Sequence, residues 1–361
     1  MAPAAGAEAR SLRWPGAVGL AISVLLLWWT LHDVALREVA SHMRQARPLA
    51  FLGAVALATA TFPLRTIRWR YLLQRNGTAL PVVPLWHATA IGFMANNLLP
   101  ARAGELARAY AARRLTGVRF TAAMGSVAVE RVFDGLILVG LLAVGIAWGG
   151  FARETSVGGV PLARVATVAA LIFVPGLVAA FWVVHWPGPA LRLTHGVMER
   201  LMPRRWATRL LGIVEGLLGG LDALKSPRRF VLVTVWSIVL WVVSAASYWL
   251  GFIALGLDLP ASAALVLQGL IAFGVAIPSS PGFFGPFEAV TRATLGLYGV
   301  EAVQGVSFAV AYHIAVFLPI SLLGLWSLSR AHLHLADLKT AGAAAEAGGA
   351  AQAAGGGEAR P

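Results

Sequence analysis

Apolar residues in this chain gather into long runs that short polar segments separate. Each run is close to the ~20 residues that a helix needs to cross the hydrocarbon core of a bilayer. About six full membrane spans are predicted, at Pro15–Leu31, Pro48–Leu64, Phe120–Trp148, Val160–Trp186, Phe230–Leu255 and Ala302–Leu328. The pattern therefore predicts an all-α polytopic membrane protein.

Two further apolar stretches are interrupted by proline and glycine. Pro81–Leu99 is followed by a short segment at Glu105–Leu115, and Ala261–Ile277 by a short helix that ends near Tyr298. Two half-length helices that meet at such a break are typical of a re-entrant hairpin, whose non-helical tip must be covered by protein or face a water-filled cavity. The predicted helix-break residues are Pro100, Gly104, Pro278, Pro281, Gly282 and Gly285.

These features recur at a spacing of 181 residues, which places Pro100 on Pro281 and Phe120 on Glu301. The order of span, hairpin and span therefore occurs twice at the same spacing, which predicts an internal repeat. The predicted transmembrane domain covers residues 15–330, with repeat units at about 48–148 and 229–328 and a link at 149–228.

Three predicted crossings separate the two units, so the second unit should be inverted relative to the first. Inverted repeats with broken helices near the midplane are typical of transporters that open one site to each side in turn. We therefore expect the breaks at Pro100 and Pro281 to lie close together near the membrane centre and to enter from opposite faces.

The 29 Lys and Arg residues support this topology, because most of them fall in segments that it places in the cytoplasm. It predicts a cytoplasmic N-terminus at residues 1–14 and a cytoplasmic, disordered tail rich in Ala and Gly at residues 331–361. We interpret Arg65–Tyr71 as the basic and aromatic collar of an interface, and residues 187–229 as an amphipathic, Arg-rich loop. A cleavable signal peptide is disfavoured, because the Trp pair at Trp28 makes a poor cleavage site.

Composition excludes several classes of protein. Hydrophobic residues make up 58% of the chain and charged residues only 12%. The formal net charge of +13 does not indicate a nucleic-acid partner, because the basic residues are scattered between spans. The chain has no Cys, and its eight His show no metal-binding spacing, so we expect no metal and no cofactor.

Charged and polar side chains inside apolar segments are costly unless they are paired or hydrated, so they mark candidate sites. Arg131 and Asp134 lie three residues apart, and Glu130 and Asp134 four apart, which gathers charge on one helix face. The predicted substrate-binding residues are Asn96, Asn97, Arg102, Glu105, Arg108, Glu130, Arg131, Asp134, Ser279, Ser280, Glu288 and Arg292.

Each candidate also has a structural interpretation. The break residues can simply end helices, Glu105 and Glu288 can complement helix dipoles, and the charge cluster can be an ion pair that holds helices together. The lone polar residues His87, Gln268 and His313 are interpreted as satisfied packing residues.

Three motifs occur in order: Asn96-Asn97-Leu98-Leu99-Pro100-x-Arg102-x-Gly104-Glu105, Glu130-Arg131-x-x-Asp134 and Pro278-Ser279-Ser280-Pro281-Gly282-x-x-Gly285-x-x-Glu288. They resemble the signature of the lysylphosphatidylglycerol synthase transmembrane-region family. The resemblance implies a bacterial or archaeal cytoplasmic-membrane protein, similar to the lipid-flipping part of the multiple peptide resistance factor. That larger protein also carries a soluble aminoacyl-transferase. We expect no such domain here, so aminoacyl transfer is not carried over.

The residues and the resemblance together predict that the protein flips or scrambles an anionic phospholipid or a related lipid across the membrane. We expect no enzymatic activity. Arginine suits a phosphate because its planar fork donates two parallel hydrogen bonds. The predicted roles are Arg102 and Arg108 at the inner approach, Arg131 at the midplane, Arg292 at the outer approach, and Glu105, Asp134 and Glu288 as residues that hold these arginines or carry coupling protons.

Two alternatives stay open: an ion-coupled transporter of a small polar solute, and a membrane partner of a lipid-modifying or glycosyl-transferring enzyme. A lipid substrate requires a polar groove that opens sideways to the bilayer, with Phe283 and Phe284 either as its apolar lip or as packing of the hairpin tip. Membrane lipids are the expected partners. The sequence leaves open which lipid is carried, the driving force and whether the chain forms a homo-oligomer.

Overall fold

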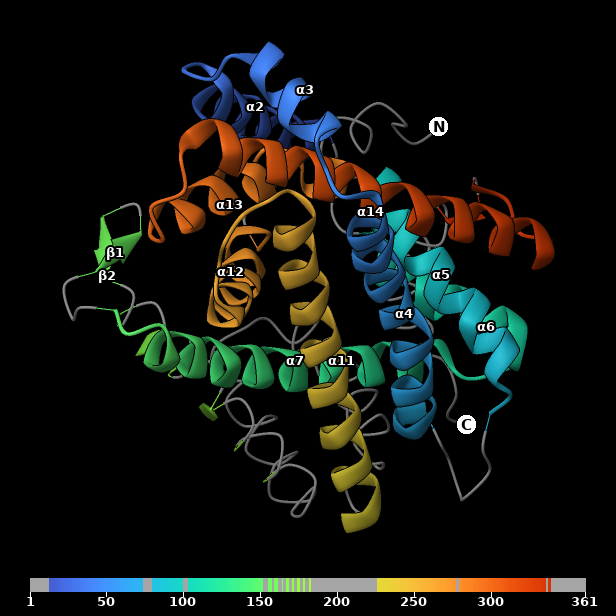
Figure 1. The fold of residues 1–361 in the computed structure, drawn as a ribbon. Coiled ribbons are helices and arrows are strands. Elements are labelled where there is room, and N and C mark those ends of the chain that lie inside the picture. The colour runs from blue at the N-terminus through green and yellow to red at the C-terminus, as the bar shows by residue number, and fades with distance from the viewer. Residues whose placement is uncertain are drawn as a thin grey trace, which may run out of the picture.

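The structure is a computed structural model in which nearly all described residues are helical (Figure 1). The described residues are 13–73, 80–99, 103–151, 155–157, 159–161, 226–276, 279–335 and 337–338, with single positions between 164 and 182. The helices are α2 (Arg13–Leu31), α3 (Leu36–Arg44), α4 (Pro48–Leu73), α5 (Val82–Leu98), α6 (Gly104–Thr116), α7 (Phe120–Trp148), α11 (Pro227–Ala254), α12 (Ala261–Gly274), α13 (Pro286–Gly296) and α14 (Ala302–Arg330), with a 3₁₀ turn η2 (Pro281–Phe283) and two short strands, β1 (Ser156–Val157) and β2 (Val160–Pro161).

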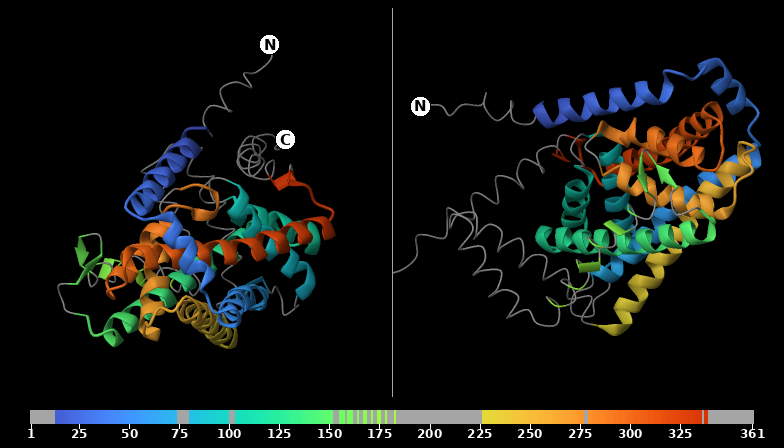
Figure 2. Two further views of the ribbon diagram at one scale, coloured as in Figure 1. Left: turned by 45° about the horizontal axis from the view of Figure 1, so that its top comes forward. Right: turned by 90° about the vertical axis from the view of Figure 1, so that its left-hand side faces the viewer.

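Three of the described helices, α4, α11 and α14, are long and apolar enough to cross a membrane. A further candidate span is the pair formed by α2 and α3, which is bent by 79°. Figure 2 shows α2 along one edge of the molecule, and it reaches the rest of the fold through α13. These helices confirm an all-α, multi-pass membrane protein. The number of six full spans stays a prediction, because most of Val160–Trp186 lies outside the described residues.

Two predicted boundaries are wrong, and one helix was not predicted. Helix α4 continues to Leu73, so Arg65–Tyr71 is part of a helix rather than a collar after it. The polar helix α3 was not predicted, because only a few of its residues are apolar. Val160 and Pro161 pair with β1 in an antiparallel ribbon, so a span cannot begin at Val160. The predicted loop at 187–225 and the residues beyond 338 lie outside the described residues.

The two predicted units have matching contacts. Helix α4 packs along α11, its counterpart at 181 residues (Figure 1). Helix α5 packs against α14, and its counterpart α12 packs against α7, which is the counterpart of α14. Helix α6 packs against α7, and their counterparts α13 and α14 also pack against each other. Reciprocal contacts of this kind are expected of two units related by a two-fold axis. How that axis lies relative to a membrane, and hence the inversion, stays a prediction.

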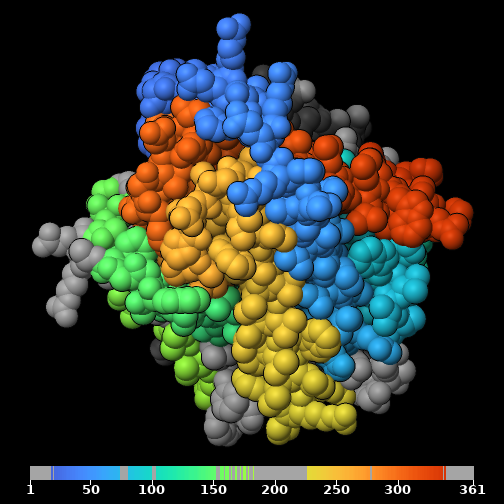
Figure 3. All heavy atoms as spheres, viewed as in Figure 1, coloured from blue at the N-terminus to red at the C-terminus, as the bar shows by residue number. Residues whose placement is uncertain are grey.

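The near face of the molecule is formed largely by α4 and α11 (Figure 3). These two helices expose large apolar side chains, including Leu49, Leu52, Val231 and Val235. Exposed apolar side chains on a membrane protein suit contact with lipid chains.

Both hairpins form at the predicted breaks. Helix α5 packs against α6, and α12 packs against α13. Helix α5, which leads into the first break, also contacts η2 at the tip of the second hairpin, so the two broken segments lie together. The break residues Pro100 and Pro278 lie outside the described residues. Whether either hairpin is re-entrant stays a prediction.

Glycine allows the first hairpin to close. A Cβ atom built on Gly104 would collide with the carbonyl oxygen of Gly92 on α5 and with the side chain of Asn96. Close helix contacts in membranes depend on such small residues, because they let the two backbones approach.

We expect Gly104→Ala to destabilise the protein by about 1–3 kcal/mol, the usual cost of overpacking a close contact. The measurement is thermal unfolding of purified protein in detergent. Gly140→Ala is the matched control, because a Cβ at Gly140 on α7 meets nothing within 4 Å. Equal unfolding temperatures for the two variants would contradict the close approach as a source of stability.

Candidate functional site

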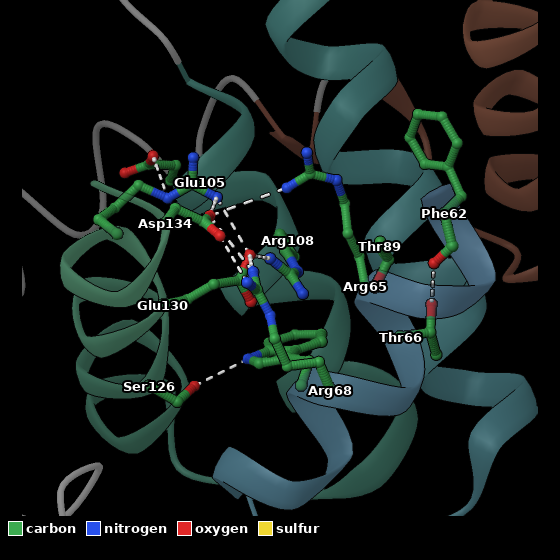
Figure 4. Close-up of polar contacts among 12 residues, drawn as sticks. Phe62, Arg65, Thr66, Arg68, Thr89, Glu105, Arg108, Ser126, Glu130 and Asp134 are labelled. Atoms are coloured by element: carbon green, nitrogen blue, oxygen red, sulfur yellow. Dashed lines mark hydrogen bonds and ion pairs between the residues drawn. The ribbon is translucent and has the colours of Figure 1, made fainter. Parts of the chain in front are cut away.

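A cluster of charged side chains lies where α4, α6 and α7 meet (Figure 4). It joins four arginines to three carboxylates, and we call it the ion cluster. Its members are Arg65 and Arg68 from α4, Glu105 and Arg108 from α6, and Glu130, Arg131 and Asp134 from α7.

Glu130 is the centre of the ion cluster. Its Oε1 lies 3.1 Å from Nη2 of Arg68, 2.8 Å from Nη1 of Arg108 and 3.0 Å from Nη2 of Arg131. The Glu130 side chain is fully buried. A buried carboxylate is costly unless it is paired, and three guanidinium groups supply that pairing.

Asp134 forms the second centre, one helical turn further along α7. Arg68 donates to both of its carboxylate oxygens, while Nη1 of Arg65 lies 3.8 Å from Oδ2 and Nη2 of Arg131 lies 3.5 Å from it. The indole Nε1 of Trp241 on α11 also donates to Asp134, at 2.9 Å. Four partners therefore hold this carboxylate between the two units.

Aromatic and hydroxyl side chains support the arginines. The guanidinium carbon of Arg108 lies 3.8 Å from the ring centre of Trp69, whose Nε1 donates to Ser126 at 2.8 Å. Arg65 lies 5.0 Å from the ring centres of both Phe93 and Trp241. Such cation–π contacts stabilise a cation that has lost its water.

The ion cluster is not neutral, because four guanidinium groups face three carboxylates. Most of the cations are buried, but the Arg131 side chain is 45% exposed. Among the described residues of the cluster, Nε and Nη2 of Arg108, Nε of Arg68 and Oε2 of Glu130 are buried without a hydrogen-bond partner. The cluster therefore carries one excess positive charge, and Arg131 is its cation nearest to solvent.

The sequence missed Arg65 and Arg68, which it placed in an interface collar. The error arose because this span was predicted to end at Leu64. Helix α4 continues to Leu73 and therefore carries both arginines into the interior of the protein. Their spacing of three residues on the end of an apolar helix was the available signal. Arg108 is also buried and paired with Glu130, and its predicted role at the inner approach stays a prediction.

The polar residues of the first hairpin hold its shape. The side-chain oxygen of Asn96 accepts a hydrogen bond from Gly104 N at 2.9 Å, and Nδ2 of Asn97 donates to Ser321 on α14 at 3.1 Å. They lie at the end of α5 beside the ion cluster. Arg102 lies outside the described residues.

The predicted residues of the second hairpin do not join the ion cluster. Glu288 contacts His313 and the backbone of Gly285 rather than an arginine, so its predicted role in holding an arginine is wrong. Ser280 N donates to Ser23 Oγ on α2, and Ser279 is half-buried beside it. Phe284 stacks on His313 with ring centres 4.5 Å apart, so it packs the hairpin tip and is no free lip.

Arg292 serves a separate contact at the end of α2. Its Nη1 donates to Thr30 O and to Asp33 Oδ1, both at 2.7 Å. Arg292 therefore caps the C-terminal end of α2 and does not lie with Arg131.

Comparison with known proteins gives a family and several relatives. The family model described as the lysylphosphatidylglycerol synthase TM region matches residues 16–324. The chain is 27% identical to "Glycosyltransferase AglD" of Haloferax volcanii over 320 residues, which is 82% of this chain and 51% of that protein. The chain thus spans about half the length of that relative.

Two further relatives are each named "UPF0104 membrane protein" and come from Methanothermobacter thermautotrophicus. One is 22% identical, with 84% of this chain and 90% of the relative covered, and the other is 25% identical, with 73% and 78% covered. No solved structure matches the chain.

Proposed function

The chain belongs to the lysylphosphatidylglycerol synthase TM-region family, and we propose that it moves an anionic phospholipid or a related lipid across the cytoplasmic membrane. The headgroup would contact the ion cluster while the acyl chains stay in the bilayer. The chain itself would carry out translocation and no covalent chemistry.

One observation carries this proposal: the ion cluster has an excess of guanidinium groups, and one of them, Arg131, is 45% exposed beside the first hairpin break. A phosphodiester headgroup carries one negative charge and accepts parallel hydrogen bonds from a guanidinium fork. Binding it would balance the charge of the cluster, so the excess positive charge of the site supports an anionic headgroup.

The second unit supports a functional role for these charges. At the same spacing of 181 residues, Glu130 corresponds to Ala311 and Arg131 to Tyr312. The matching helix crossing is thus packed with aromatic residues, including Tyr248 and Tyr312, whose rings stack 4.7 Å apart. Among the described residues, the matching helices α13 and α14 pair Glu288 with His313 but bring no group of arginines together, so this arrangement of helices does not require a cluster of guanidinium groups.

A panel of labelled lipids in liposomes tests the proposal. Purified protein is reconstituted with fluorescent phosphatidylglycerol, phosphatidylcholine or a polyprenyl-phosphate sugar, and arrival at the opposite leaflet is measured by dithionite quenching. We expect faster translocation of the lipids with a net negative headgroup. Uptake of a soluble solute with no lipid movement would instead indicate the solute transporter.

A second candidate function is that of a membrane partner of a glycosyl-transferring enzyme. It is favoured by the similarity to the relative named "Glycosyltransferase AglD". In that role the chain would move or present a polyprenyl-phosphate sugar. Selective translocation of this lipid over phosphatidylglycerol in the same panel would support it.

The proposed location is the cytoplasmic membrane, with both termini in the cytoplasm. The distribution of Lys and Arg supports this orientation, because cytoplasmic segments of membrane proteins carry an excess of both. In that orientation the first hairpin enters from the cytoplasm and the second from outside.

A further inference from the structure

The second hairpin contains a buried acid and base that the ion cluster does not use. Glu288 on α13 and His313 on α14 are 2% and 9% exposed. His313 Nδ1 lies 2.6 Å from Glu288 Oε1, and His313 Nε2 lies 2.9 Å from the carbonyl oxygen of Gly282. The other oxygen of Glu288 accepts a hydrogen bond from Gly285 N at 2.7 Å.

These contacts determine how many protons Glu288 and the His313 ring must hold together. A neutral imidazole has one N–H and one lone pair, whereas a carbonyl oxygen and a carboxylate oxygen can only accept. Both ring nitrogens of His313 face such oxygens, so the contacts with Glu288 and Gly282 need one proton more than a neutral ring and a carboxylate possess. That proton lies either on the ring or on Glu288, and in both cases all three hydrogen bonds form.

Loss of this proton would break a hydrogen bond that holds the tip of the second hairpin. With one N–H left, the charged carboxylate of Glu288 competes for it better than a neutral carbonyl does. The contact between His313 Nε2 and the Gly282 oxygen would then bring two lone pairs together. Repulsion there would release the carbonyl of Gly282 from α14.

The tip is held in a conformation that depends on such contacts. Gly282 and Gly285 have φ values of 74° and 99°, and Phe283 has a φ of 63°, which is unfavourable for a residue with a side chain. The His313 ring is packed between Phe284 and Phe287, at 4.5 and 4.3 Å between ring centres. The two hydrogen bonds of His313 thus hold a strained turn in place.

Few other described groups near the pair can titrate. Arg292 on α13 and Asp33 after α2 are paired with each other, and the hydroxyl of Tyr312 on α14 is bonded to Ser247 on α11. Tyr248 of α11 stacks on Tyr312. The other elements packed against α14 carry the charged residues of α3, His87 of α5, and Arg65, Arg68, Arg70 and Tyr71 of α4. Of these groups, only Glu288 and His313 share a proton on which the contacts of the tip depend.

We propose that Glu288 and His313 together bind one proton, and that release of this proton to water frees the tip of the second hairpin. The tip contacts α5 and is tied to α2 through Ser23, so its release would change contacts with both helices. The inference does not rest on the identity of the transported substrate, because it follows from the hydrogen bonds alone.

The test uses the absence of native cysteine in the chain. Ser279→Cys places one spin label beside the tip, and its mobility is measured by electron paramagnetic resonance, with the full chain in lipid nanodiscs, from about pH 5 to about pH 10. We expect an immobile label at low pH and a single transition to a mobile label as pH rises.

Glu288→Gln in the same background is the decisive variant. The glutamine amide can donate to His313 Nδ1 while its oxygen accepts from Gly285 N, and the neutral ring can still donate to Gly282. All three hydrogen bonds then form without a titrating proton, so the label should stay immobile across the whole range. Asp33→Asn is the control and should keep the wild-type transition, because Asp33 lies outside the pair.

Two results would overturn the inference. One is a wild-type label whose mobility does not change with pH, and the other is a Glu288→Gln variant with the same transition as the wild type. Neither measurement involves lipid movement, so failure here and failure of the proposed translocation are distinguishable.

Discussion

Glu130→Ala is expected to remove most of the folded protein from membranes. Glu130 is fully buried and contacts Arg68, Arg108 and Arg131 at 2.8–3.1 Å. Its loss would leave four guanidinium groups facing two carboxylates in a site with little access to water. Breaking a buried ion network from one side typically costs about 3–5 kcal/mol, because the remaining charges are uncompensated.

The measurement is the yield and thermal unfolding of purified protein in detergent. Glu105→Ala is the matched control, because the Glu105 side chain is 37% exposed and lies 3.6 Å from Arg131. Exposed ion pairs contribute about 1 kcal/mol or less, so this variant should unfold near the wild-type temperature.

A double variant, Glu130→Ala with Arg108→Leu, separates charge from packing. It removes one cation together with the carboxylate, so it should recover part of the yield if uncompensated charge is the cause. Equal stability of Glu130→Ala and Glu105→Ala would show that the ion cluster does not hold these helices together.

Arg131→Leu is expected to lower lipid translocation by about 10- to 100-fold while the protein stays folded. The fold should survive because Glu130 keeps Arg68 and Arg108, and Asp134 keeps its two α4 partners. The rate should fall because a hydrogen bond from a charged group contributes about 1.5–3 kcal/mol, which corresponds to this loss if Arg131 binds the headgroup in the transition state.

Rates are measured in the liposome panel with unfolding temperatures recorded for each variant. Arg114→Leu removes a positive charge from an exposed position on α6 and should translocate at the wild-type rate. Arg131→Lys keeps the charge but not the planar fork, and we expect an intermediate rate. A folded Arg131→Leu variant with full activity would remove Arg131 from the site, and loss of folded protein would indicate a structural ion pair.

The sequence by itself determined the helices and their breaks. The predicted Phe120–Trp148 coincides with α7, and the predicted last span, Ala302–Leu328, falls within α14. The breaks before Gly104 and Pro286 are also where helices begin. These features could be read from the chain because hydrophobic runs, Pro and Gly act on the backbone within a few residues of their own position.

The sequence also indicated part of the ion cluster, because Glu130, Arg131 and Asp134 lie on one helix and their spacing decides that they face each other. It did not reveal the partners on α4. Arg68 and Asp134 are 66 positions apart, and an arginine in a buried ion pair looks the same in sequence as an arginine at a membrane surface.

Only the tertiary structure decided which charges share a site. Glu288 and Arg292 are both predicted from the sequence to bind substrate, yet the packing of α13 turns Glu288 toward His313 and Arg292 toward Asp33. The reason is physical: a charge removed from water takes whichever partner the packing of helices brings within about 3 Å. That choice is made by contacts between segments far apart in the chain, which local sequence patterns do not record.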